Sequence, residues 1–135
     1  MAQYRFASPQ FREVLKDLAE ARLHSNHAGR GDAWWQIEGA MRELGHRSCG
    51  EKNSRSNPRY EPRLENARPI PAGSVEELFG GLPSEFDREA RRAVVCLVRA
   101  DRDLVKMTQT PATKEARLWI GAAFDLLVGG RRPRV

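Results

Sequence analysis

The sequence predicts a small, all-α, Arg-rich domain, and three observations lead to that fold class. Apolar residues recur at helical spacing in several stretches, each bounded by residues that start or stop helices. No stretch alternates apolar and polar residues in the way that a half-buried strand requires. The 135 residues suffice for one compact core, and 40% hydrophobic with 30% charged residues is typical of a globular domain.

Residues 1–45 are expected to form a helical hairpin. Ser8-Pro9 is a helix start, since serine caps free backbone amides and proline fits the first turn. The face of this helix, which we expect to end near Leu23, comprises Phe11, Val14, Leu15, Leu18, Ala19 and Arg22. After a turn over 24–31, Asp32 is expected to cap a second helix that Gly45 stops. Its buried stripe comprises Trp34, Ile37, Met41 and Leu44.

Residues 46–73 form a Pro- and Arg-rich loop that is either disordered or laid on the surface as an extended arm. The net charge is +5, and it is concentrated here and in the tail: residues 46–73 hold six basic and three acidic side chains, and 131–135 hold three arginines. Flexible basic segments often contact phosphates. The candidate contacts in the loop are Arg47, Lys52, Arg55, Arg59, Tyr60, Arg63 and Arg68. A GC-rich genome would also favour arginine over lysine. Tyr60, between Arg59 and Arg63, either stacks on a base or a partner or simply pins the loop.

Residues 74–130 return to helical spacing. Ser74 begins a capping-box pattern for a short helix that Gly80-Gly81 stops, and Ser84 is expected to cap the next helix. The buried face of that next helix comprises Phe86, Ala90, Val94, Leu97 and Val98. A short helix over Asp103–Met107 follows, and Thr110-Pro111 opens the last helix, which ends at Gly129-Gly130. The face of the last helix comprises Ala116, Trp119, Ile120, Ala123 and Leu127. We expect all these segments to form one compact unit.

The order of long helix, short helix, turn and final helix is that of a helix-turn-helix motif. In such a motif the N-terminal residues of the last helix meet base edges in the major groove. Here those residues are Thr113, Lys114 and Arg117, on the face opposite the apolar one. An ordinary helical hairpin with a solvated charged face is the alternative interpretation.

Several short motifs carry a resemblance to a known family. Leu82-Pro83 with the arginines after it, the Thr110–Thr113 turn and the closing Ile120–Leu127 resemble the C-terminal region of lambdoid phage late-gene antitermination proteins of the Q type. That region is similar to the DNA-reading part of sigma factors. Upstream, Ala33–Trp35 and Leu44–Ser48 resemble the early tryptophan segment and Leu-Gly turn of those proteins, although the zinc-ligating cysteine pairs of some members are absent.

The resemblance implies a transcription antitermination factor that binds double-stranded DNA and RNA polymerase with its sigma factor. Such a factor lets polymerase read through terminators, and it is not an enzyme. Together with the helix-turn-helix interpretation and the basic tail, it predicts DNA contacts by Arg88, Arg91, Thr113, Lys114, Arg117, Arg131 and Arg132. The basic loop would contact nucleic acid or polymerase. A different class of function is a small phage-type inhibitor that binds a host nucleoprotein defence complex without reading DNA sequence.

Catalysis and metal binding have little support in the sequence. No Gly-x-Ser-x-Gly, phosphate-binding glycine loop or His-Glu-x-x-His occurs, so a small metal-dependent enzyme or nuclease is a distant third interpretation. His24, His27, His46 and Cys49 form a possible zinc set. In a hairpin the length of the second helix, about 20 Å, separates the two pairs, so we expect neither metal nor cofactor.

Three expectations remain. Trp35 lies about 100° around its helix from Trp34, so it is either packed beside the core or an anchor for a protein partner. Cys96 is expected to be a small buried hydrophobe. The chain has two cysteines, no apolar run long enough to span a membrane and no signal peptide, which predicts the cytoplasm, of the host cell if phage-encoded.

Overall fold

The computed structural model describes residues 9–45, 67–73, 77–78 and 88–128. These residues hold four helices: α1 (Pro9–His27), α2 (Gly31–Glu43), α5 (Arg88–Lys106) and α6 (Pro111–Leu127). No strand occurs among the residues described, so the all-α prediction is confirmed. None of the helices described is long and apolar enough to cross a membrane.

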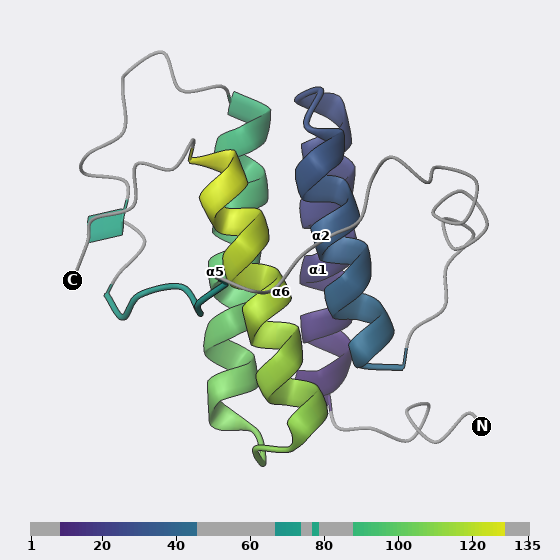
Figure 1. The fold of residues 1–135 in the computed structure, drawn as a ribbon, viewed down its shortest axis with the longest axis vertical. Helices are drawn as coiled ribbons and strands as arrows, with labels where there is room; N and C mark the ends of the chain where they lie inside the picture. Colours follow the sequence, from purple (N-terminus) through teal and green to yellow (C-terminus); the bar gives the residue numbers. More distant parts are fainter. Residues whose placement is uncertain (1–8, 46–66, 74–76, 79–87, 129–135) are drawn as a thin grey trace.

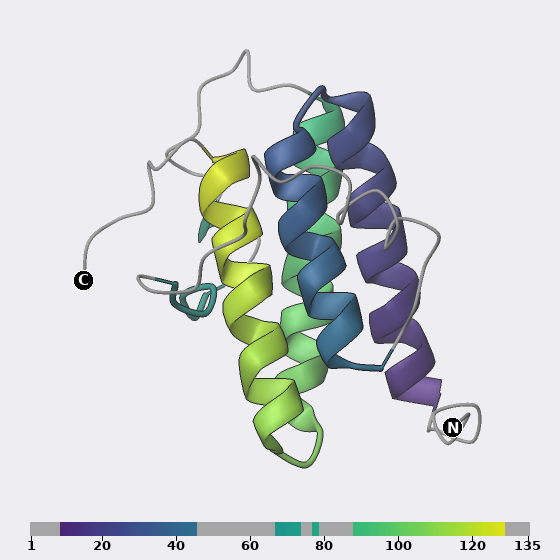
Figure 2. The same cartoon turned by 45° about the vertical axis from the view of Figure 1, so that its right-hand side comes forward.

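The helices form a four-helix bundle in which each helix runs antiparallel to both of its neighbours (Figures 1 and 2). The hairpin of α1 and α2 packs against the hairpin of α5 and α6, with α1 beside α5 and α2 beside α6. Short turns join the helices within each hairpin, as antiparallel bundles require. The C-terminus of α1 therefore lies at the same end of the bundle as the N-terminus of α5.

The core is formed by apolar faces that follow the helical period. The largest apolar side chains that are fully buried are Leu18, Ile37, Met41, Leu97, Leu104, Ile120 and Leu127. The predicted faces of α5 and α6 are confirmed at the residues described, except that Trp119 is only partly buried. Trp34 was expected in the α2 stripe and is also only partly buried. Small residues of α2, among them Ala33 and Ala40, are fully buried instead.

The predicted end of α1 near Leu23 is wrong, since the helix continues to His27. Gly29 supplies the turn, with a φ of 72° that suits glycine. α2 begins at Gly31 with Arg30 in the capping position, so Asp32 lies in the first turn and is not the cap. Its carboxylate accepts a hydrogen bond of 2.8 Å from the Ala33 amide. Gly45, with a φ of 89°, follows the end of α2 as predicted.

The separate short helix predicted at Asp103–Met107 is also wrong. α5 continues without a break to Lys106, and Leu104 belongs to its buried face. The charge of Asp101 interrupts the apolar pattern, but that residue is fully buried, so the helix face continues through it. The C-terminal region is therefore a two-helix hairpin, which is the alternative that the sequence left open, and the predicted helix-turn-helix is not formed.

Part of the predicted basic loop packs on the bundle. Ile70 is buried in the core, and the backbone of residues 68–69 lies directly on α6. A Cβ atom on Gly121 would lie 1.8 Å from the carbonyl oxygen of Arg68, so only glycine permits this contact. The predictions at Ser8, residues 46–66, Ser74, Gly80-Gly81, Ser84, Phe86 and 129–135 lie outside the residues described.

Candidate nucleic-acid interface

Thr113 was predicted to read bases, and the structure places it in the cap of α6 instead. Its side chain is buried, and its hydroxyl oxygen accepts a hydrogen bond of 2.8 Å from the amide of Thr110. In return the Thr110 hydroxyl accepts one of 3.1 Å from the amide of Thr113. This reciprocal capping box satisfies backbone donors that the first helical turn leaves free. The prediction of a base contact by Thr113 is therefore wrong.

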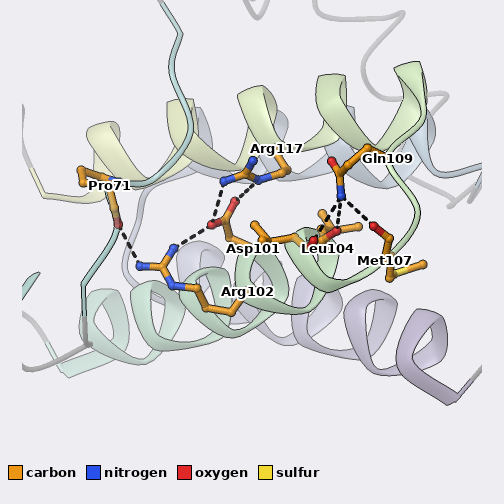
Figure 3. A network of polar contacts seen from close by, with 8 residues as sticks. Pro71, Asp101, Arg102, Leu104, Met107, Gln109 and Arg117 are labelled. Carbon is orange, nitrogen blue, oxygen red and sulfur yellow. Dashed lines mark hydrogen bonds and ion pairs between the residues drawn. The ribbon is translucent and has the colours of Figure 1, made fainter.

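Arg117 was predicted to face DNA, and it is held by Asp101 of α5 (Figure 3). Its Nε donates to Asp101 Oδ1 over 2.8 Å, and the Asp101 side chain is completely buried. Arg102 donates to the other carboxylate oxygen over 2.7 Å. A buried carboxylate requires such partners, because its ionised form loses hydration on burial. Arg117 thus joins α6 to α5 and does not face outward as predicted.

Segment 67–73, which we call the strap, covers part of the outward side of α6. The second guanidinium nitrogen of Arg102 fixes it by donating to the carbonyls of Pro71 over 2.8 Å and Gly73 over 2.9 Å. A recognition helix must be free to enter the major groove. The strap crosses α6 at Gly121, in the middle of the helix, so α6 is not free in this way. Lys114 remains exposed near its N-terminus.

The outward face of α5 holds most of the exposed positive charge of the hairpin formed by α5 and α6. Five exposed cations lie on this helix: Arg88, Arg91, Arg92, Arg99 and Lys106. At about 100° per residue they fall within an arc of roughly 100°, and they extend over about 27 Å along the axis. We call this surface the cationic face. Arg92 also lies 3.3 Å from the Glu89 carboxylate, one turn away.

Only Arg88 and Arg91 of this face were predicted as contacts. Arg92, Arg99 and Lys106 were not predicted, because residues 74–130 hold eight basic and nine acidic side chains and their net charge gives no sign of a basic surface. The spacing of Arg88, Arg92, Arg99 and Lys106, in steps of four and seven, was the signal that could have revealed the face.

Carboxylates of α1 border the cationic face on one side. A groove between α1 and α5 is lined by Glu13, Lys16, Asp17, Glu20, Val98, Arg99, Arg102 and Asp103. Burial raises the pKa of Asp17, Arg99 opposes that shift, and the carboxylates around Asp17 add to it. Arg99 is thus partly neutralised by α1.

The other candidates are distributed as follows. Trp35 is partly buried and packs edge-on against Trp34, with ring centroids 4.7 Å apart. Cys96 is buried as predicted, and burial, followed by the nearby Glu20 and Asp17, raises the pKa of its thiol to about 11. Arg68 of the strap is exposed. The predicted residues Arg47, Lys52, Arg55, Arg59, Tyr60, Arg63, Arg131 and Arg132 lie outside the residues described.

The structure describes only two of the four residues in the possible zinc set. His46 and Cys49 lie outside the residues described, whereas His24 and His27 meet Glu89 at the first turn of α5. No protein family, curated protein or solved structure matched this chain when they were compared with it.

Proposed function

We propose that this protein is a non-enzymatic nucleic-acid-binding regulator that contacts the phosphate backbone through the cationic face of α5. The observation that carries the proposal is the row of five exposed Arg and Lys side chains on one face of a helix whose opposite face is buried. Because the apolar face anchors α5 in the bundle, the helix positions its cations as a rigid row. Such a row matches a regular array of phosphates better than mobile charges do.

The composition of the face fits phosphate recognition. Four of its five residues are arginines, whose planar guanidinium groups form paired hydrogen bonds with phosphate oxygens. At about 3.4 Å per base pair, a row of roughly 27 Å runs along about eight base pairs. Phosphate contacts fix position and orientation without reading bases, so we expect little dependence on sequence from this face.

Transcription antitermination is the specific form of this proposal that the family resemblance supplies. In that form α5, and not α6, holds the DNA while other surfaces contact RNA polymerase. The inhibitor alternative needs an apolar surface for a protein partner. The exposed large hydrophobic residues in the part of the chain that is described are Leu23 and Val105, on different helices, and two isolated side chains do not make such a surface.

Fluorescence anisotropy with a labelled duplex and a labelled single strand at several salt concentrations tests the proposal. Each phosphate contact contributes about −0.9 to the slope of log affinity against log salt on a duplex. Replacing Arg88, Arg91 and Lys106 with Gln should therefore make the slope shallower by about two to three. Arg99 is left intact in this variant because Asp17 partly neutralises it.

The matched control replaces three exposed cations of other helices, Arg12 and Lys16 of α1 and Lys114 of α6, with Gln. Its change in net charge is identical, and its salt slope should stay close to that of the wild type. Equal losses in the two triple variants would show diffuse attraction and refute a defined interface. If the wild type binds neither nucleic acid at low salt, the inhibitor becomes the better function. Circular dichroism would verify that both variants keep their helices.

A further inference from the structure

A second polar cluster lies where α1 ends and α5 begins, and the cationic face does not include it. His24 Nδ1 lies 2.8 Å from Glu89 Oε1, and His27 Nδ1 lies 3.4 Å from the same oxygen. One potential ligand atom from each of the three residues falls within 4.8 Å of the other two. Two imidazoles and a carboxylate thus converge on one point.

Local and tertiary structure both contribute to this convergence. Because α1 continues to His27, the two histidines are three residues apart on one helix and share a face. Their ring centroids are 6.3 Å apart and the rings are nearly perpendicular. Glu89 belongs to the first turn of α5, and the antiparallel packing of α1 and α5 brings these two helix ends together.

The ligand atoms suit a transition-metal ion. Zinc binds imidazole nitrogen and carboxylate oxygen at about 2.0–2.2 Å, so neighbouring ligands in a tetrahedral site lie about 3.3–3.5 Å apart. The two separations of 2.8 and 3.4 Å, with all atoms inside 4.8 Å, need only small side-chain adjustments to reach that geometry. The last turn of α1 also favours a cation, because the carbonyl end of a helix is negative.

The surroundings of His24, His27 and Glu89 leave the cluster open to solvent and orient the Glu89 carboxylate. The three side chains are 20%, 53% and 26% exposed, in the order His24, His27 and Glu89, so an ion can enter from solvent and retain a water ligand. Arg92 lies 3.3 Å from Glu89 Oε2 and orients the carboxylate so that Oε1 faces the histidines.

We propose that His24, His27 and Glu89 bind a divalent transition-metal ion, zinc above all, and that the ion joins the end of α1 to the start of α5. Three protein ligands leave one coordination position for water or a fourth donor. Zinc prefers this nitrogen and oxygen set, whereas magnesium and calcium take oxygen ligands. The site shares its two histidines with the set considered from the sequence, but Glu89 of α5 replaces His46 and Cys49.

Zinc titration of chelator-treated protein without a histidine tag, followed by calorimetry, tests the site. We expect one equivalent to bind and the thermal midpoint to rise with it, because the ion binds only the folded arrangement. Co²⁺ should give the visible absorption of a four- or five-coordinate nitrogen and oxygen site. Replacing Glu89 with Gln or His27 with Ala should each weaken zinc binding on the order of 100-fold, since losing a direct ligand costs at least as much as losing an outer-shell partner.

Two controls make the result specific. The first control, Glu115→Gln, removes an exposed carboxylate from α6. The second control combines His46→Ala with Cys49→Ala and removes the other two residues of the possible zinc set considered from the sequence. Both control variants should bind zinc with wild-type affinity. Absence of stoichiometric binding by the wild type would overturn the proposal. So would binding that survives Glu89→Gln but disappears in the His46 and Cys49 variant. Circular dichroism of Glu89→Gln and His27→Ala, both changes at solvent-accessible side chains, separates lost ligands from lost folding.

Discussion

The outward sides of α5 and α6 differ although both helices carry arginine and lysine. On α6, Arg117 is bound to the buried Asp101, Thr113 belongs to the helix cap, and the strap crosses at Gly121. On α5, five cations remain exposed along the length of the helix. A charged residue on a helix is thus accessible to a partner only if the neighbouring elements leave it exposed. Arg117 and Thr113 of α6 stabilise the bundle, whereas the cationic face of α5 is exposed to solvent.

The largest effect that tests this comparison should come from Asp101→Ala. The substitution removes the carboxylate that accepts hydrogen bonds from both Arg117 and Arg102, so we expect a loss of about 3 kcal/mol in the free energy of unfolding, at roughly 1.5 kcal/mol for each of the two charge-assisted interactions. Denaturant unfolding measures the loss. Asp103→Ala, also on α5 but partly exposed, should change stability by about 0.5 kcal/mol or less. Equal effects of the two substitutions would contradict the structural role of Arg117.

The contact of the strap with α6 is tested by Gly121→Ala. Alanine favours a helix by about 1 kcal/mol over glycine, but here its Cβ would lie 1.8 Å from a backbone oxygen, so the strap must move. We expect a net loss of about 1–3 kcal/mol in thermal or denaturant unfolding. Gly31→Ala is the matched control, because nothing lies within 4 Å of the added atom and no loss should follow. A stabilised Gly121→Ala protein would show that the strap does not rest on α6.

The burial of Cys96 on α5 should affect how the stability of the protein depends on pH. The Cys96 thiol has a pKa of about 11 in the folded protein and 9.0 ordinarily, chiefly because it is buried. Its contribution is fully present below pH 9 and is lost as pH rises through about 11, since the unfolded chain gives up the proton first. In a Cys49→Ser background, Cys96→Ala should make the decline in unfolding free energy above pH 9 shallower. An unchanged decline would mean that the thiol already reaches solvent.

The smallest effect is expected from Lys114→Ala. Lys114 is exposed on α6, so its loss should alter unfolding free energy by about 0.5 kcal/mol or less. In anisotropy titrations it should leave duplex affinity and salt slope close to wild type, whereas loss of a base-reading contact would cost about 1–3 kcal/mol. A sequence-dependent loss of that size would restore α6 as the DNA-reading helix and contradict the comparison.

Local sequence signals determined much of the secondary structure. Apolar spacing predicted the buried face of α5 and most of that of α6, Thr110-Pro111 predicted the start of α6, and Gly45 predicted the stop after α2. These features depend on neighbouring residues: capping, glycine conformation and the helical period act over a few positions. The prediction was wrong at the end of α1 and at the helix break expected before Asp103. Polar residues suggested an end at both places, but a polar residue within a helix can be solvated or buried with a partner.

Only the tertiary structure decided which polar residues pair. Nothing in the local sequence connects Asp101 with Arg117 16 residues away, or His24 with Glu89 65 residues away. The packing of α5 against α6 buries Asp101 and thereby withdraws Arg117 from the surface. The packing of α1 against α5 places two histidines beside one carboxylate. The sequence by itself determined the helices and their apolar faces, because these depend on neighbouring residues. Which charged residues pair, and which stay exposed, depends on long-range packing and followed only from the fold.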